Sequence, residues 1–220
     1  SKVKSRIRNN DFDAIFHLAS LVHVKLCNED PLKACSINIG GTDNIVQSLK
    51  GLAKMPWLFY ASTSHVYKLK NTPISETDNI SPRSFYGYTK RMGEKLLENI
   101  DSISSKNFCI GRIFSFYSLS QSDDFLYSSI REKLKENKKT IFISNANNIL
   151  DIQKAESVVK IIIKLFNKRA QGTINIGTGK GITIKSFARK LTKKKIIIKT
   201  DTKEKIMVIA NIEKLNSIIS

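Results

Sequence analysis

Short apolar runs alternate with amphipathic stretches along most of the chain. The first apolar run is residues 14–19, and Pro31 then opens a helical pattern that continues to about Lys50. Short apolar runs are typical of buried strands, whereas apolar residues three and four apart predict helices. Further strands are predicted at 57–62, 107–112, 140–143, 173–176 and 195–199, and further helices at 84–100, 123–137, 154–168 and 183–193. Strands separated by helices pair in parallel, so the pattern predicts an α/β fold whose sheet is covered on both faces.

A turn-rich stretch runs from Lys70 to Ser84 and contains Pro73 and Pro82. We expect it to form a loop over the carboxyl ends of the first strands, which is the edge of an open α/β sheet where ligands bind. No repeat or low-complexity linker separates the two halves of the sequence. We therefore expect residues 1–118 to form the main domain and residues 119–220 a smaller region whose strands return to the same sheet.

Composition indicates a globular protein. The chain has 220 residues, of which 41% are hydrophobic, and this is enough to bury a core. No apolar run has the length of a membrane span, and residues 1–5 lead into no signal core, so a cytoplasmic location is expected. Cys27, Cys35 and Cys109 have no metal-type spacing; they are expected to be reduced packing residues, and no metal site is predicted.

The formal net charge is +18, which raises the question of a nucleic-acid partner. The lysines are mostly single residues on helical faces, and 193–195 is the only continuous run in the C-terminal third. No aromatic residues are interleaved there to stack on bases. The pattern therefore argues against nucleic acid and favours a general preference for anionic ligands.

The pair of residues most suggestive of chemistry is Tyr86 and Lys90. A spacing of four residues places both on one face of the predicted helix. A phenol has an ordinary pKa of about 10, so it acts as a general acid/base near neutral pH when a positive neighbour stabilises the phenolate. The spacing is also common on amphipathic helices without any such role. The surrounding segments therefore have to distinguish a catalytic pair from an incidental one.

Other polar side chains are expected near this pair. The strand at 57–62 leads into Ser62-Thr63-Ser64-His65, which places hydroxyl groups at its carboxyl end, where one of them could share a proton with the phenol. The small residues Ala19 and Ser20 follow the first strand and would let a flat cofactor lie against the backbone. Asn38 could brace the end of that strand through its amide.

Together these segments resemble the extended short-chain dehydrogenase/reductase family, in particular its NAD-dependent epimerase/dehydratase branch that acts on nucleotide sugars. The segments that carry the resemblance are His17-Leu18-Ala19, 38–42, 62–67, Tyr86-Gly87-x-Thr89-Lys90 with Glu94, and 175–179. The resemblance covers nearly the whole chain. It implies a Rossmann-like doubly wound parallel sheet, with 1–118 as a partial NAD-binding domain and 119–220 as the substrate-binding region.

The resemblance also implies roles for individual residues. Tyr86 would be the general acid/base, Lys90 would hold the nicotinamide ribose and lower the tyrosine pKa, and Thr63 would bind the reacting sugar hydroxyl. The cofactor site would be lined by Ala19, Ser20, Asn38, Ser62, Tyr86, Lys90 and Phe114. The nucleotide-sugar substrate would contact Thr63, Ser64, His65 and Ser115.

Departures from the family pattern reduce the number of candidate activities. Ser64 and His65 stand where the sugar 4,6-dehydratases carry an Asp and a Glu, which favours epimerisation through a transient keto-sugar over dehydration. Ser115 replaces the usual Asn, and Leu150 replaces an arginine that binds the substrate phosphates. The alternatives are a related nucleotide-sugar reductase or dehydratase, or a truncated, inactive member that serves as an interaction module.

The largest departure is at the front of the sequence. The family begins with a strand, a Gly-rich turn and a helix that hold the cofactor pyrophosphate, and residues 1–10 contain no glycine and no strand pattern. We therefore expect the first βαβ unit to be missing. The segment Gly177-Thr-Gly-Lys-Gly181 is similar to the Gly-rich fingerprint of dinucleotide-binding turns, but its third glycine is one position early. We therefore do not expect it to bind the cofactor pyrophosphate. NAD is the expected cofactor, with NADP as the alternative because the ribose-reading residue is absent.

The resemblance finally implies a homodimer. The predicted helices at 33–50 and 86–100 are similar to the pair that forms a four-helix dimer interface in the family.

Overall fold

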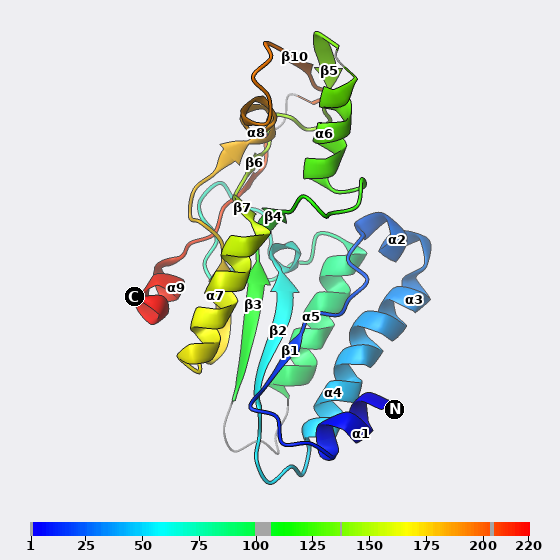
Figure 1. Ribbon diagram of the computed structural model, residues 1–220, viewed down its shortest axis with the longest axis vertical. Coiled ribbons are helices and arrows are strands. Elements are labelled where there is room, and N and C mark those ends of the chain that lie inside the picture. The colour runs from blue at the N-terminus through cyan, green and yellow to red at the C-terminus, as the bar shows by residue number, and fades with distance from the viewer. Residues whose placement is uncertain (1, 100–106, 137, 203–204) are drawn as a thin grey trace.

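The computed structural model describes residues 2–99, 107–136, 138–202 and 205–220. Its centre is a sheet of parallel strands in the order β1-β2-β3-β8 (Figure 1). The strands are β1 (Ala14–His17), β2 (Trp57–Thr63), β3 (Phe108–Ile113) and β8 (Gly172–Ile176). The prediction of an α/β fold with a parallel sheet is confirmed, and β8 returns from the second half of the chain to this sheet.

Helices cover both faces of the sheet. On one face, Ile7, Val46 and Leu97 pack against Leu58 and Tyr60. These residues come from α1 (Lys2–Arg8), α4 (Gly41–Leu49) and α5 (Phe85–Glu98), which lie side by side in Figure 1. On the other face, α7 (Ala155–Asn167) and α9 (Glu213–Ile219) pack against Trp57 and Phe59. Strand β2 is thus buried on both sides, because its side chains alternate between two apolar clusters.

The predicted helix from Pro31 to about Lys50 is not one continuous α-helix. Asp30 caps α3 (Pro31–Cys35) by accepting a hydrogen bond from Lys33 N at 2.9 Å. A π-helical turn, η1 (Ser36–Gly40), then leads into α4. A π turn of five residues is too short for periodicity to reveal, and such turns occur frequently at functional sites. A further helix that the sequence did not predict, α2 (Val24–Glu29), precedes α3.

The second half of the chain adds smaller sheets around its own core. Parallel strands β5 (Thr140–Phe142) and β10 (Ile197–Lys199) pack with α6 (Leu126–Lys135) and α8 (Ile184–Lys190). Five further short strands went unpredicted: β4 (Ser115–Tyr117), β6 (Ile149–Leu150), β7 (Ile152–Lys154), β9 (Ile182–Thr183) and β11 (Met207–Val208). The predicted helix ends at residues 100 and 137 lie outside the described residues. The division at residue 118 stays a prediction.

The carboxyl ends of β2 and β3 point towards these small sheets (Figure 1). The 3₁₀ turn η2 (Ser64–Val66) follows β2 at this edge. Within the described ranges, no helix is both long and apolar enough to cross a membrane.

Candidate active site

The first turn of α5 is anchored on η2. The Ser84 hydroxyl caps the helix by accepting a hydrogen bond from Gly87 N at 3.1 Å. A Cβ atom at Gly87 would lie 2.6 Å from the carbonyl oxygen of His65, so the helix and the turn are in direct contact there. This contact places Tyr86 beside the end of β2.

Tyr86 lies among side chains from β2 and η2. Burial raises the pKa of its phenol to about 12, and a hydrogen-bonding interaction with the Thr63 hydroxyl opposes the rise. The ring of His65 meets the Tyr86 ring edge-on, with 5.9 Å between centroids. The structure therefore brings together Thr63, His65 and Tyr86, three of the residues predicted for the site.

Lys90 is 2% exposed, and its ammonium group lies over the ring of Tyr60, with Nζ 4.3 Å from the ring centroid. Burial lowers its pKa to about 7, and the nearby charge of Glu94 opposes that change. The expectation that Lys90 lowers the pKa of Tyr86 is not met in this structure. Both groups have lost water, and Thr63 is the group that lowers the pKa of the phenol.

His65 is held as a neutral ring. Its Nδ1 lies 3.1 Å from the Ser84 hydroxyl. Burial, and then the charge of Arg83, lower its pKa to about 4. The Arg83 side chain donates to the carbonyl oxygen of Ser64 at 3.2 Å, which keeps the positive charge close to the turn.

Asn38 braces the loop that follows β1, as the sequence suggested. Its Oδ1 accepts hydrogen bonds from Leu21 N at 2.7 Å and from the Ser20 hydroxyl at 2.8 Å. Its Nδ2 donates to Leu21 O at 3.0 Å and to Thr89 Oγ1 at 2.9 Å. The Ser20 hydroxyl is thus engaged within the loop, whereas Ala19 is exposed at the same edge of the sheet.

Ser62 makes a contact that the sequence did not predict. Its hydroxyl donates to Oε1 of Glu94 at 2.5 Å, and Glu94 is fully buried. The same carboxylate receives two hydrogen bonds from Arg112, at 3.0 and 2.9 Å. The position of Glu94, four residues after Lys90, was the available signal, but nothing in the sequence identified its partners.

Phe114 and Ser115 differ in their surroundings. The Phe114 side chain is 2% exposed and packs into an apolar cluster with Tyr67, Ile74 and Val208. Ser115 is half-buried at the start of β4. The Phe114 side chain therefore belongs to the core, and its backbone N donates to the carbonyl oxygen of Ile176 at 2.9 Å.

The Gly-rich segment at 177–181 is folded around a carboxylate of its own chain. Asp151 is fully buried and accepts hydrogen bonds from Thr178 N at 2.9 Å, Thr178 Oγ1 at 2.6 Å and Gly179 N at 2.9 Å. Those amides are therefore already engaged by Asp151, so this segment is not free to bind a pyrophosphate through them.

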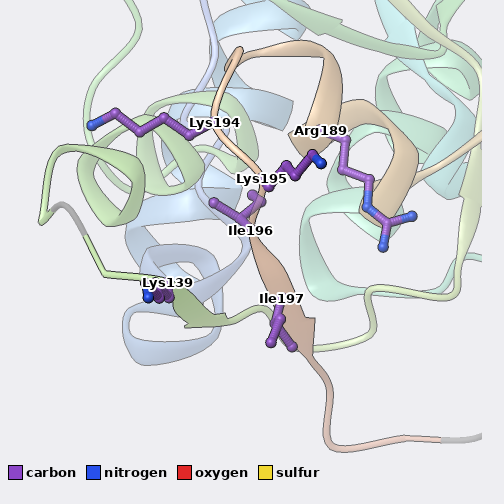
Figure 2. Close-up of a pocket in the computed structure, with 6 residues that line it drawn as sticks. All are labelled: Lys139, Arg189, Lys194, Lys195, Ile196 and Ile197. Atoms are coloured by element: carbon purple, nitrogen blue, oxygen red, sulfur yellow. The ribbon is translucent and has the colours of Figure 1, made fainter.

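A basic hollow of about 570 Å³ lies elsewhere, at β5, β10 and the end of α8 (Figure 2). It is lined by Lys139, Arg189, Lys194, Lys195, Ile196 and Ile197. Figure 2 shows the four cationic side chains pointing in different directions, and all four are exposed. This arrangement indicates a hydrated basic surface, and the hollow shares no residue with the predicted site.

The family model for GDP-mannose 4,6 dehydratase matches residues 1–218. The chain belongs to this family. The match confirms the resemblance to the nucleotide-sugar epimerase/dehydratase enzymes that the sequence motifs indicated.

Individual curated relatives have low sequence identity to this chain. The GDP-6-deoxy-D-talose 4-dehydrogenase of Aggregatibacter actinomycetemcomitans is 28% identical over 186 residues, which cover 83% of this chain and 62% of the relative. UDP-glucuronate 4-epimerase 1 of Arabidopsis thaliana is 28% identical over 70% of this chain and 36% of its own length. The chain therefore spans less than two thirds of these curated relatives.

Solved structures share the fold of this chain. A mutant of UDP-glucuronic acid 4-epimerase from Bacillus cereus, in complex with UDP-4-deoxy-4-fluoro-glucuronic acid and NAD, superimposes with a TM-score of 0.86 at 23% identity. The match covers 100% of this chain and 72% of that one.

Proposed function

We propose that the protein is an NAD-dependent nucleotide-sugar epimerase that works through a transient keto-sugar. The observation that carries the proposal is the grouping of Thr63, His65 and Tyr86 at the carboxyl end of β2, with Lys90 one helical turn behind. Membership of the family, and relatives that act on UDP- and GDP-sugars, support the substrate class.

The chain would move the proton in this reaction. In its phenolate form, Tyr86 takes the proton of the sugar hydroxyl at Oη, with Thr63 sharing the hydrogen bond, while the carbon that bears this hydroxyl becomes a carbonyl. The reaction therefore needs a phenol pKa below the value of about 12 that burial produces here. A bound NAD would supply the acceptor for the hydride of that carbon and the donor for its return. The keto-sugar then rotates in the site so that the hydride returns to its opposite face. Tyr86 gives the proton back to the oxygen, so protons and electrons balance over the cycle.

Lys90 fits the ribose end of a dinucleotide. A buried ammonium group has three donors and no acceptor, and the pair of ribose hydroxyls would offer it oxygen atoms in place of the water that it has lost. Exposed Ala19 leaves room against the loop that Asn38 braces. The amides of 178–179 are engaged by Asp151, so the pyrophosphate is assigned to a segment other than 177–181.

The residues of η2 favour epimerisation over loss of water. Elimination requires an acid that protonates the departing hydroxyl group, and the positions after Thr63 are Ser64 and His65. His65, with a pKa of about 4, carries almost no proton to donate near neutral pH. A dehydratase is nevertheless the second candidate, because the matching family model describes one.

The test is product analysis with UDP-, GDP- and dTDP-sugars, using the protein expressed from its complete reading frame. Proton NMR should show an epimer of one of these sugars, with no net consumption of NAD. Tyr86→Phe should lower turnover at least ~100-fold, whereas Tyr88→Phe, at an exposed position two residues later, should retain it.

Other products would point elsewhere. A 4-keto-6-deoxy-sugar would identify a dehydratase, and net oxidation or reduction of the cofactor would identify a dehydrogenase or reductase. Absence of both NAD binding and turnover would favour the interaction-module alternative. Equal rates for Tyr86→Phe and the parent protein would contradict the assigned acid/base.

We further propose that a second copy of the chain covers α3, η1 and α5. Leu32 is 84% exposed there, and Ile37, Tyr88 and Met92 are also exposed. Light scattering should report a dimer that Met92→Lys weakens. Val159→Lys, at an exposed apolar position of α7, should leave the dimer intact.

A further inference from the structure

The carboxylate of Glu94 gathers donors from two strands and from its own helix. Ser62 on β2 donates at 2.5 Å, Arg112 on β3 donates twice, and Arg91 on α5 donates at 2.6 Å. Glu94 is 0% exposed and Arg112 is 3% exposed. One buried side chain thus ties α5 to the carboxyl ends of both central strands.

The arginine is itself fixed from the far side. Arg112 donates to the carbonyl oxygen of Glu76 at 3.3 Å, and its guanidinium lies 4.7 Å from the centroid of the Tyr67 ring. Buried ion pairs are weak stabilising devices, because well-packed apolar residues of similar volume often serve as well. A role other than stability is therefore worth seeking for this one.

Glu94 lies one helical turn beyond Lys90, which in turn lies one turn beyond Tyr86, so the three share one face of α5. The groups around the Lys90 ammonium are His17 from β1, Tyr60 from β2 and Glu94 from α5. Of these, Glu94 is the one that carries a negative charge, which favours the ammonium form of Lys90, and the face of the Tyr60 ring favours the same form. His17 is neutral near pH 7 because burial and the charge of Lys90 lower its pKa to about 4.

We propose that Glu94 is a positioning residue, which keeps the Lys90 ammonium charged in its buried site and holds α5 in register with Ser62 and Thr63 at the end of β2. The importance of Lys90 for catalysis rests on the proposed function. The effect of Glu94 on Lys90 does not, because it can be measured without substrate.

The decisive measurement is the titration of Lys90 by NMR in protein labelled with ¹³C-lysine, with its signal assigned by its loss in Lys90→Arg. In Glu94→Gln, Lys90 should lose its proton about one pH unit lower than in the parent protein. Glu98→Gln is the matched control, since Glu98 also pairs with Arg91, at 2.7 Å, but is exposed and has no contact with Ser62 or Arg112. It should leave the Lys90 titration unchanged.

Glu94→Gln leaves Arg112 buried without its partner and could prevent folding. In that case Glu94→Gln combined with Arg112→Met removes both charges together, and the Lys90 titration should still move to lower pH. An unchanged titration in the folded variant would overturn the inference. A shifted titration together with full activity of Tyr86→Phe would overturn the proposed function and leave this inference standing.

Discussion

The side-chain amide of Asn38 donates a hydrogen bond to the Thr89 hydroxyl at 2.9 Å, joining segments 51 residues apart in the chain. Thr89 Oγ1 in turn donates to the carbonyl oxygen of Tyr86 at 2.8 Å. Since Asn38 also binds both backbone polar groups of Leu21, one amide connects the loop after β1 to the first turn of α5. The predicted cofactor loop and the predicted acid/base are therefore mechanically linked.

Replacing Asn38 should reduce the stability of the fold more than the loss of an exposed polar side chain does. Asn38→Ala removes the acceptor of the partly buried Leu21 amide and the amide donors to the Leu21 carbonyl and to Thr89 Oγ1. We expect the free energy of unfolding to fall by about 1–3 kcal/mol. Urea denaturation measures this. Asn44→Ala, at an exposed position of α4, should change stability by less than about 0.5 kcal/mol. Equal effects of the two variants would contradict the bracing role.

Gly93 is required by the packing of Tyr60. A Cβ atom at this position would overlap the Tyr60 hydroxyl and lie 2.7 Å from Cζ of the ring. Gly93→Ala should destabilise the protein by about 1–3 kcal/mol through overpacking. Adding Tyr60→Phe should recover part of the loss, because the hydroxyl is gone while the ring remains.

Gly41→Ala provides the opposite case for comparison. Gly41 has helical backbone angles, and nothing lies within 4 Å of its Cβ position. The substitution should raise the melting temperature, with a gain of about 0.5–1 kcal/mol. A loss of stability in both Gly41→Ala and Gly93→Ala would contradict the claim that the room around the added Cβ atom decides the effect.

Stability should decrease as the pH falls from about 6.5 towards 4. His17 is buried, its Nε2 lies 2.9 Å from Thr42 Oγ1, and burial lowers its pKa from 6.5 to about 4. In this window the unfolded chain binds a proton that the folded chain does not, so His17 destabilises the fold by up to about 3 kcal/mol near pH 4. Below that pH the contribution levels off.

His17→Gln tests this directly. Melting temperatures measured between pH 4 and 7 should fall less steeply than in the parent protein, although His65, whose pKa is also lowered to about 4, should keep part of the slope. Parallel curves for the variant and the parent would contradict the assignment to His17.

Asp151 should be sensitive to the loss of charge alone. Every group within hydrogen-bonding distance of its carboxylate is a donor, from Thr178, Gly179 and Ala210. Asp151→Asn turns an NH₂ group towards these donors, and we expect a loss of about 2–3 kcal/mol. Asp201→Asn is the control, because Asp201 is exposed while it accepts from Asn145 N. Similar losses of stability in both variants would contradict a specific requirement for the carboxylate of Asp151.

The sequence predicted the central architecture because β2, β3, β8 and α5 each carry a long enough pattern of apolar residues. It missed strands such as β6 and β11, since a strand of two residues has no periodicity. The π turn at Ser36–Gly40 was missed for a related reason, because a segment of five residues is too short for periodicity to distinguish a π turn from an α-helical one.

For the candidate site, the sequence predicted residue types but not their partners. Tyr86, Thr63 and Asn38 were singled out by their chemistry, their spacing and the family resemblance. No sequence pattern indicated that the Ser62 hydroxyl binds Glu94 or that the Phe114 side chain packs with Tyr67, because both depend on contacts between distant segments. Burial of Tyr86 and Lys90 likewise changes their pKa values in ways that spacing cannot reveal.

Strand β1 has a consequence for handling the protein. Within the described residues β1 pairs only with β2, so its other edge carries backbone groups that no strand of this sheet meets. Phe16 on this strand is 42% exposed, although its ring touches Trp57 and Phe166. An open edge beside exposed aromatic surface is a template for adding a strand from another molecule. Preparations of these 220 residues should therefore be limited by colloidal stability, and an additive that masks strand edges should extend their lifetime in solution.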